Sequence, residues 1–186
     1  HSGGLDSTVL LHALSRETTL KSKINAIHVN HSISPDSDKW EELCKKNADE
    51  LGVKFFSYKL EELEIVTEDN LRKIRYEKFD HWASSNDLIL TAHHKDDQVE
   101  TILFRFMRGT GLNGLKGIPA WRKDGNSQFH RPLLDVSKRE LYEYAQNNKL
   151  KWVEDESNRD IDIYRNFIRN KLLPTIKDKW PKAEKS

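Results

Sequence analysis

Cysteine is almost absent from this chain, which has Cys44 alone among its 186 residues. A single thiol cannot form an intramolecular disulfide, and this is typical of a protein in a reducing compartment, so we expect a cytoplasmic location. Neither a second cysteine nor a third histidine stands at a spacing typical of a zinc site. Cys44 falls on the apolar face of an expected helix, so we interpret it as a buried packing residue rather than a nucleophile.

Long apolar runs are also lacking. No hydrophobic stretch approaches the length needed to span a bilayer, and no signal peptide is visible, so we expect no membrane association. The sequence shows no internal repeat, low-complexity tract or long linker. Hydrophobic residues make up 36% and charged residues 33%, which indicates a globular domain with a modest core, and the length indicates one domain with an appendage.

A strong net charge is missing as well, since the formal value is +1. The charges are nevertheless unevenly placed. Residues 36–69 hold eleven acids and five bases, whereas residues 102–131 hold six bases and one acid, and residues 164–186 hold seven bases and two acids. Two basic stretches indicate a polyanionic partner. Taken alone, however, charge favours a solvated lysine-rich surface.

Strands and helices are predicted to alternate along the first half of the chain. Apolar runs predict buried strands at 24–29, 53–58 and 88–91, with amphipathic helical patterns between them. This alternation predicts an α/β fold, a Rossmann-like open parallel sheet with helices on both faces. Ligands of such sheets bind beyond the carboxyl ends of the strands, so we expect the site near 2–7, 30–31 and 92–97.

The chain after Gly109 is predicted to be less regular, and Ser137 with Glu140 forms a capping box. We therefore divide the chain into a larger domain at 1–135 and a helical extension at 136–186. The expected elements are a loop at 110–119, an exposed excursion at 120–130, a helix from Ser137 to about Asn148, and a helix from Tyr164 to Leu173 that Pro174 interrupts.

The chain opens on a glycine-rich turn, Ser-Gly-Gly-Leu-Asp-Ser at 2–7. Adjacent glycines let the backbone turn tightly and bring its N–H groups close to an anion. Apolar residues from Leu5 to Leu14 recur at helical spacing, so the positive end of a helix dipole would point into the same turn. We interpret the segment as a phosphate-binding turn, and an ordinary tight turn is the alternative.

A second polar segment, residues 91–101, follows the third predicted strand and reads Thr-Ala-His-His-Lys-Asp-Asp-Gln-Val-Glu-Thr. Apolar residues then recur at helical spacing, so we expect Asp96 to cap a helix and Asp97 and Glu100 to lie in its first turn. The segment alone supports two interpretations equally. Its acids could take part in catalysis, or they could only cap the helix while the two histidines occupy the sheet edge.

These motifs, in this order, resemble a known family. The first turn resembles the pyrophosphate loop of the N-type ATP pyrophosphatases and differs from a Walker A loop, because no Gly-Lys-[Ser/Thr] follows. With His-His-x-Asp-Asp-Gln-x-Glu-Thr behind it, the chain resembles the tRNA(Ile)-lysidine synthetases. Other segments similar to that family, in the same order, are Leu71–Tyr76, Arg108–Gly117, Arg131–Leu134, Trp152–Asn158 and Tyr164–Arg169.

The resemblance implies a PP-loop ATPase fold and a C–N bond-forming ligase. Enzymes of this family use ATP to adenylate the C2 oxygen of the wobble cytidine of tRNA(Ile) with a CAU anticodon. Free L-lysine then displaces AMP to give lysidine, and pyrophosphate is the other product. Magnesium is the expected metal, since it prefers oxygen ligands and needs only one or two carboxylates.

The same resemblance implies roles for individual residues. ATP would bind at Ser2, Gly3, Gly4, Leu5, Asp6 and Ser7. The catalytic residues would be Asp6, Arg72, Arg75, His93 and Asp97, with Mg²⁺ at Asp6 and Asp97 and the lysine proton taken by His93 or Asp97. The tRNA backbone would contact a basic strip made of Arg105, Arg108, Lys116, Arg131, Arg165 and Arg169.

The chain departs from the family pattern in three places. A strand precedes the first motif in the family, whereas this chain starts one residue before it, so we expect that the first strand is missing. Glu156 stands where the family often has proline. No C-terminal tRNA-binding domain follows Ser186, so we expect a short form or a truncated catalytic core.

Three alternatives come from other functional classes. A thiolating tRNA enzyme of the same superfamily usually needs paired cysteines, which argues against it. A non-catalytic nucleotide-binding module would leave Asp97, the arginine pair and the basic stretches without a common purpose. An amide-forming synthetase acting on a small acid would not need the basic stretches. The sequence leaves the oligomeric state open, a homodimer included.

Overall fold

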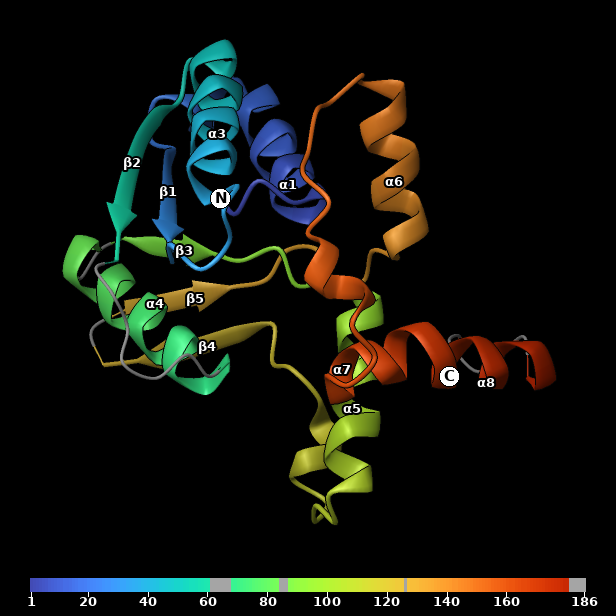
Figure 1. Cartoon of the computed structure of the whole chain (residues 1–186). Helices are drawn as coiled ribbons and strands as arrows, with labels where there is room; N and C mark the ends of the chain where they lie inside the picture. Colours follow the sequence, from blue (N-terminus) through green and yellow to red (C-terminus); the bar gives the residue numbers. More distant parts are fainter. Residues whose placement is uncertain (61–67, 84–86, 126, 181–186) are drawn as a thin grey trace.

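The computed structural model describes residues 1–60, 68–83, 87–125 and 127–180, in which helices and strands alternate (Figure 1). The helices are α1 (Leu5–Arg16), α2 (Thr18–Lys21), α3 (Ser37–Leu51), α4 (Glu68–Trp82), α5 (Lys95–Met107), α6 (Lys138–Asn147), α7 (Tyr164–Phe167) and α8 (Leu173–Lys179). The strands are β1 (Asn25–Asn30), β2 (Lys54–Lys59), β3 (Leu88–Leu90), β4 (Trp121–Asp124) and β5 (Ser127–His130). Short 3₁₀ turns occur at Gly114–Lys116 and Glu156–Arg159, and a π-helical turn occurs at Ile168–Leu172.

The strands form two hydrogen-bonded sheets within the described residues. In one sheet β1 pairs in parallel with β2, and in the other β3 pairs in parallel with β5. The predicted parallel α/β architecture is confirmed, with strand bounds displaced by about one residue. The edge strand β4 runs antiparallel to β5, which the prediction did not include.

The prediction of an exposed excursion at 120–130 is wrong, because this segment forms the β4–β5 hairpin. Ser127 and Phe129 are each only 1% exposed, whereas the neighbouring Gln128 is exposed. This alternation is the signature of a strand with one buried face. The polar residues of the segment concealed it in the sequence, since Phe129 is the only large apolar residue of β5.

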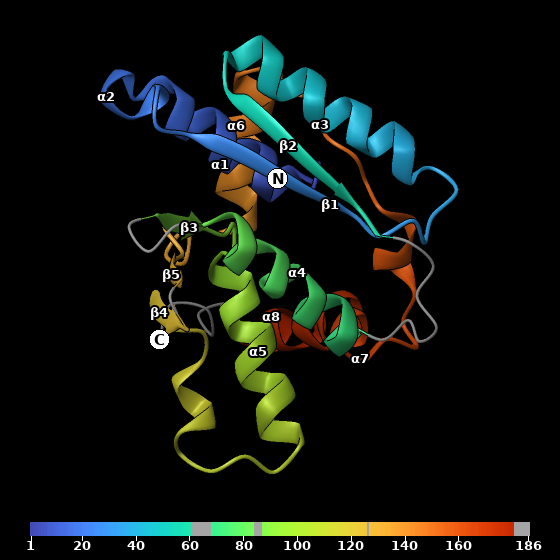
Figure 2. The same cartoon turned by 90° about the vertical axis from the view of Figure 1, so that its left-hand side faces the viewer.

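Helices cover both faces of the first sheet, as predicted (Figure 2). On one face, Phe55 of β2 packs against a buried cluster that includes Leu11 of α1 and Ala48 of α3. On the other face, the ring centroid of Phe56 lies 4.4 Å from that of Trp82 in α4. Adjacent residues of β2 therefore contact opposite helical layers, as the two-residue repeat of a strand requires.

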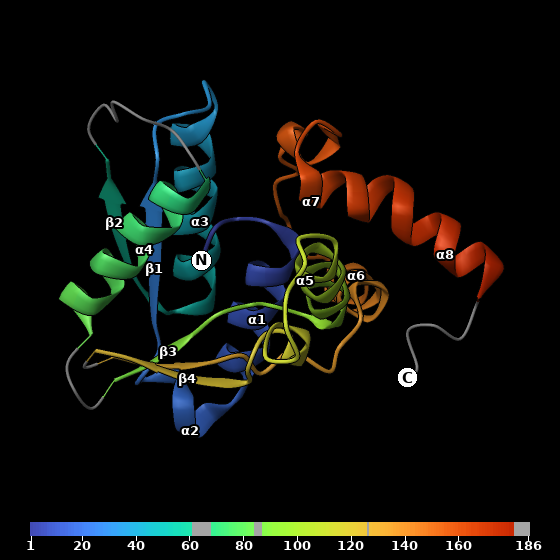
Figure 3. The same cartoon turned by 90° about the horizontal axis from the view of Figure 1, so that it is seen from below.

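The helical extension packs against the rest of the chain through α6 and the α7–α8 arm. Val9 of α1 shares a buried cluster with Leu141 and Ala145 of α6. The predicted capping box opens α6, since Ser137 N donates to Glu140 Oε2 at 2.8 Å. Figure 3 shows the arm beside α5, away from the strands. The domain boundary at 135/136 stays a prediction.

Pro174 does not interrupt the final helical segment, which corrects the prediction. Proline stands in the first turn of α8, where its missing N–H would have no intrahelical partner, and the π-helical turn leads directly into that helix. Among the described residues, no helix has both the length and the apolar character that a membrane crossing requires.

Candidate functional site

The N-terminal turn has a conformation that requires glycine at position 3. Gly3 has φ +86°, and a Cβ added there would lie 3.0 Å from the Sγ of Cys44. The carbonyl of Gly3 accepts a hydrogen bond of 2.9 Å from Val153 N, which anchors the turn to the C-terminal half. The predicted burial of Cys44 is confirmed at 0% exposure.

The turn leads directly into α1. Gly4 is the N-cap, and Thr8 N donates to its carbonyl at 3.0 Å, which is the first helical hydrogen bond. The earlier N–H groups of a helix have no intrahelical partner and point outward with the positive end of its dipole. Ser7 closes the turn, because its Oγ accepts from Ser2 N and donates to the carbonyl of Gly4, each at 3.1 Å.

The second polar segment folds differently from its predicted cap. Helix α5 begins at Lys95, so its N-cap is His94 and not Asp96. Asp97, three residues further on, accepts a hydrogen bond from His94 N at 2.9 Å through Oδ2. This hydrogen bond fixes the Asp97 side chain at the helix N-terminus. Asp96 does not cap the helix, so its carboxylate can contact other residues.

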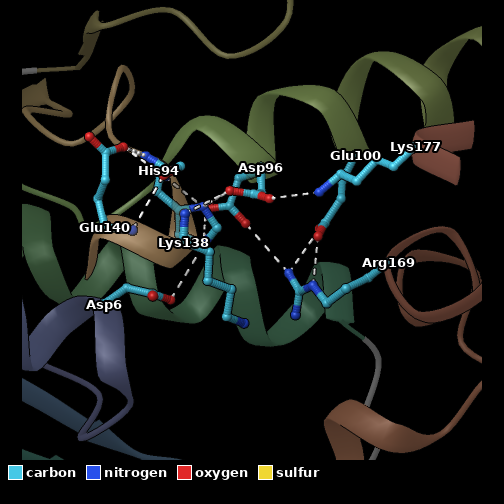
Figure 4. A network of polar contacts seen from close by, with 10 residues as sticks. Asp6, His94, Asp96, Glu100, Lys138, Glu140, Arg169 and Lys177 are labelled. Atoms are coloured by element: carbon cyan, nitrogen blue, oxygen red, sulfur yellow. Dashed lines mark hydrogen bonds and ion pairs between the residues drawn. The ribbon is translucent and has the colours of Figure 1, made fainter. Parts of the chain in front are cut away.

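Buried His94 brings the two polar segments together (Figure 4). Its Nε2 lies 3.6 Å from an Asp6 oxygen and 3.6 Å from an Asp97 oxygen, and its Nδ1 lies 3.7 Å from Asp96. The side chain of His94 is only 1% exposed. Three carboxylates, one from the N-terminal turn and two from α5, therefore surround a single imidazole.

The local electrostatics follow from this arrangement. Burial lowers the pKa of His94, but the carboxylates of Asp96, Asp97 and Asp6 outweigh it, so the net shift is upward and favours the imidazolium. Burial raises the pKa of Asp6 despite the opposing charge of His94. The contact with His94 and the hydrogen bond from Lys138 N hold the pKa of Asp96 well below its usual range.

A further set of charged groups supports the acidic segment from the C-terminal half. Arg169 donates from Nε and Nη2 to the two carboxylate oxygens of Glu100, at 2.6 and 2.8 Å, and its Nη2 lies 3.5 Å from Asp97. Asp96 accepts from Lys138 N at 2.8 Å and lies 3.7 Å from the Lys177 ammonium. Helix α5 is thus tied to α6 and to the α7–α8 arm on the side of its acids.

Comparison with known proteins identifies the family of this chain. The family described as the PP-loop domain matches residues 1–176. This chain belongs to the PP-loop domain family. That membership supports the use of ATP. The Ser2–Ser7 turn is called the PP-loop below, and its binding of phosphate stays a prediction.

Two curated relatives of this PP-loop chain carry the same name. The chain is 41% identical over 188 residues to the tRNA(Ile)-lysidine synthase of Pseudomonas fluorescens (strain Pf0-1), covering 100% of this chain and 42% of that protein. It is 43% identical over 189 residues to the tRNA(Ile)-lysidine synthase of Pseudomonas syringae pv. tomato, with the same two coverages. The chain thus spans less than half the length of these curated relatives.

A solved structure shares the PP-loop fold at low sequence identity. The U34-tRNA thiolase NcsA from Methanococcus maripaludis, solved with its [4Fe-4S] cluster, superposes with a TM-score of 0.75 at 16% identity. The match covers 100% of this chain and 66% of that chain. At this identity the likeness supports the fold and carries no argument about chemistry.

The predicted magnesium ligands of the PP-loop site pass a test of fit. Asp6 Oδ1 is buried and makes no hydrogen bond, so an oxygen lone pair is available to a cation. The Asp6 and Asp97 carboxylates contact the same nitrogen of His94, and they are therefore close neighbours. Among the described residues, no three acidic, histidine or cysteine side chains are arranged to hold a metal ion by themselves. Mg²⁺ is often held by one or two carboxylates together with water and phosphate, so Asp6 and Asp97 would be enough to bind it.

The glycine-rich segment after α5 is held by three side chains that the sequence analysis did not combine. Gln98 forms a reciprocal pair with Ile118, donating to its carbonyl at 2.6 Å and accepting from its N–H at 2.5 Å. Arg105 donates to the carbonyls of Gly114 and Gly117. Arg131 is 2% exposed and donates to the carbonyl of Pro119 at 2.6 Å.

The predicted basic strip is therefore not one exposed surface, which corrects the sequence analysis. Arg105, Arg131 and Arg169 point to protein carbonyls or carboxylates. Arg108 and Lys116 are exposed. The spacing of arginines in a sequence does not show whether a guanidinium binds a protein carbonyl or faces solvent. Spacing alone therefore could not separate the paired arginines from the exposed ones.

The other predicted residues have varied surroundings. Half-buried Arg165 donates to Thr101 Oγ1 at 3.3 Å, and His93 Nδ1 lies 3.0 Å from Thr91 Oγ1. The side chains of Arg72 and Arg75 lie outside the described part of the chain, although their backbone belongs to α4. The turn at Glu156, where the family often has proline, is capped by Asp155, which accepts from Ser157 N at 2.9 Å.

The strict need for glycine in the PP-loop gives a first prediction. Gly3→Ala should lower the free energy of unfolding by about 1–3 kcal/mol, because alanine is strained at positive φ and its Cβ would meet Cys44. Urea unfolding measures the loss. The double variant Gly3→Ala/Cys44→Ala should recover only part of it, since it removes the contact and leaves the strain. A Gly3→Ala variant as stable as the unmodified protein would contradict this account of the turn.

Proposed function

We propose that this protein acts as a tRNA(Ile)-lysidine synthase, which adenylates the wobble cytidine of a CAU anticodon and joins free L-lysine to it. One observation carries the proposal. His94 brings Asp6 of the PP-loop and Asp97 of α5 into one cluster, in a chain about 40% identical to proteins of that name. This contact supports the proposal that the two segments form a single site.

Adenylation requires stabilisation of charge on the leaving pyrophosphate. The N–H groups of Gly3, Gly4 and the first turn of α1 would bind its oxygens, already oriented by the turn. Asp6 and Asp97 would hold Mg²⁺, which neutralises phosphate charge when bound. The carboxylates around His94 raise its pKa and so favour its positively charged form, which offsets part of the repulsion between these acids.

The second step needs a lysine amine without its extra proton. Asp97 and His93 follow the carboxyl end of β3, and either could accept that proton. Arg72 and Arg75 would contact phosphate or the developing anion. The exposed Arg108 and Lys116, with Arg165, would contact the tRNA backbone.

The thiolation alternative has less support from the structure. Sulfur transfer uses a reactive thiol or a cluster bound by several cysteines. The only thiol of this chain is buried, and burial raises the pKa of Cys44 to about 11. It is therefore almost fully protonated at neutral pH and packs beneath the PP-loop.

Nucleoside analysis tests the proposal. The protein is incubated with ATP, Mg²⁺, isotope-labelled lysine and a tRNA(Ile) transcript with a CAU anticodon, and the digested nucleosides are measured by mass spectrometry. Labelled lysidine should form only when ATP is present and should be absent from a transcript with a GAU anticodon. A protein that releases pyrophosphate equally with any tRNA, or that adds sulfur instead of lysine, would overturn the proposal.

A further inference from the structure

The β4–β5 hairpin presents an aromatic pair that no role described above uses. Trp121 of β4 and His130 of β5 are stacked, with ring centroids 4.0 Å apart and an interplanar angle of 17°. Trp121 is nevertheless 59% exposed. His130 Nδ1 donates to the carbonyl of Ala120 at 3.2 Å, because that oxygen can only accept, and this bond fixes the imidazole beneath the indole.

The hairpin separates its charges between its two faces. Arg122 pairs with Asp124, and its guanidinium lies 5.3 Å from the ring centroid of Tyr76 in α4. Residues two apart on a strand share a face, so Trp121 and exposed Lys123 lie together on the opposite face. That face of the described hairpin strands therefore carries the Trp121 indole and the Lys123 ammonium. Asp124, the only acid of β4, lies on the other face.

The position of the pair connects it to the PP-loop site. Trp121 stands opposite His130 in the β4–β5 ladder, and His130 stands opposite Leu90, the last residue of β3. Thr91 N also donates to the carbonyl of His130 at 3.1 Å. The stacked pair thus lies at the end of β3 from which the chain continues to His93 and Asp97.

We propose that the Trp121–His130 pair is a stacking platform for an unpaired base of the RNA substrate, with Lys123 contacting an adjacent phosphate. This inference rests on the proposed function. An exposed indole accepts any base by stacking, and a cation on the same face suits the RNA backbone. Lys123 on the same face favours an anionic partner. The pair also lies at the end of β3 that leads to the candidate site, so a base stacked there would be close to it.

Binding of a fluorescently labelled CAU anticodon stem-loop, followed by anisotropy, tests the platform. Trp121→Ala should weaken binding about tenfold, the loss expected for removal of one stacked base, whereas Trp121→Phe should retain most of the affinity. Trp180→Ala is the matched control, since Trp180 is 63% exposed at the end of α8 and should have no effect. Lys123→Gln should reduce the slope of log affinity against log salt by about one.

Three results would overturn the platform. One is equal affinity of Trp121→Ala and the unmodified protein for the stem-loop. Another is an equal loss with a fully paired duplex, which has no unpaired base. The third is a loss of self-association in Trp121→Ala with RNA binding unchanged, which would assign this face to a second copy of the chain.

Lysidine formation, measured in parallel, separates this inference from the proposed function. If lysidine forms and Trp121→Ala binds the stem-loop normally, only the platform fails. If no lysidine forms while loop binding still depends on Trp121, only the proposed reaction fails.

Discussion

Asp6→Asn should lower pyrophosphate release from ATP by about 100-fold or more, the loss expected when a metal-binding carboxylate is replaced. Asparagine keeps the shape of the side chain and removes its charge. The affected oxygen is buried and has no hydrogen-bond partner in the structure, so its loss is felt mainly by a bound cation. Pyrophosphate release with tRNA present measures the effect, and stem-loop binding should be unchanged.

The same substitution should leave the fold at least as stable as before. Burial raises the pKa of Asp6 above its ordinary value, so ionised Asp6 is less favourable in the folded chain than in the unfolded one. The folded state is therefore penalised at every pH above the ordinary pKa of an aspartate, neutral pH included, and asparagine removes this penalty. The midpoint of thermal unfolding without Mg²⁺ should therefore be equal or higher.

Asp96→Asn is the matched control with the opposite expectation. Its pKa is lowered, so the ionised carboxylate stabilises the fold above about pH 4, and this contribution is lost as pH falls through the folded pKa. Asp96→Asn should lower the unfolding midpoint at pH 7. Full pyrophosphate release by Asp6→Asn would contradict the metal role. A lower thermal unfolding midpoint for Asp6→Asn would contradict the conclusion that the buried, ionised Asp6 destabilises the fold.

The sequence was sufficient for features that depend on local chemistry. The glycine-rich turn, the amphipathic helices and the Ser137 capping box are each specified by neighbouring residues, and the structure contains all three. The meeting of the PP-loop with residues 93–97 also followed from sequence, because parallel strands end at one edge of a sheet. That rule gave the place of the candidate site without any knowledge of side-chain contacts.

The sequence was not sufficient for features that depend on distant partners. His94 was placed at the sheet edge in one of two open interpretations and had no assigned role in the other, and its position in a buried cluster depends on the distant Asp6. Arg169 stands in a basic stretch typical of a solvated surface, yet it is half-buried against Glu100, 69 residues away, and against Asp97. The β5 strand was concealed by its polar residues, since burial of Ser127 is set by packing rather than by its own hydropathy.

Arg169→Met should lower the free energy of unfolding by about 3–5 kcal/mol, because it leaves the Glu100 carboxylate buried without its partner. Glu100 is 2% exposed and both of its oxygens accept hydrogen bonds from this one guanidinium. Methionine preserves most of the packing of the arginine stem, so the loss reports on the charge. Urea unfolding at unchanged m-value measures it.

Two variants give this prediction its specificity. In the double variant Glu100→Gln/Arg169→Met no charge remains to be buried, so most of the lost stability should return. Arg139→Met removes an arginine paired with Glu143 on the surface of α6, where its side chain is 86% exposed, and should have little effect. Equal losses for Arg169→Met and Arg139→Met would show that the Glu100 pair is not an interior one. Arg169 would then be an RNA contact, and its removal should reduce the salt dependence of stem-loop binding. If the interior pair is intact, Arg169→Met should leave that salt dependence unchanged, because Arg108, Lys116 and Arg165 would make the phosphate contacts.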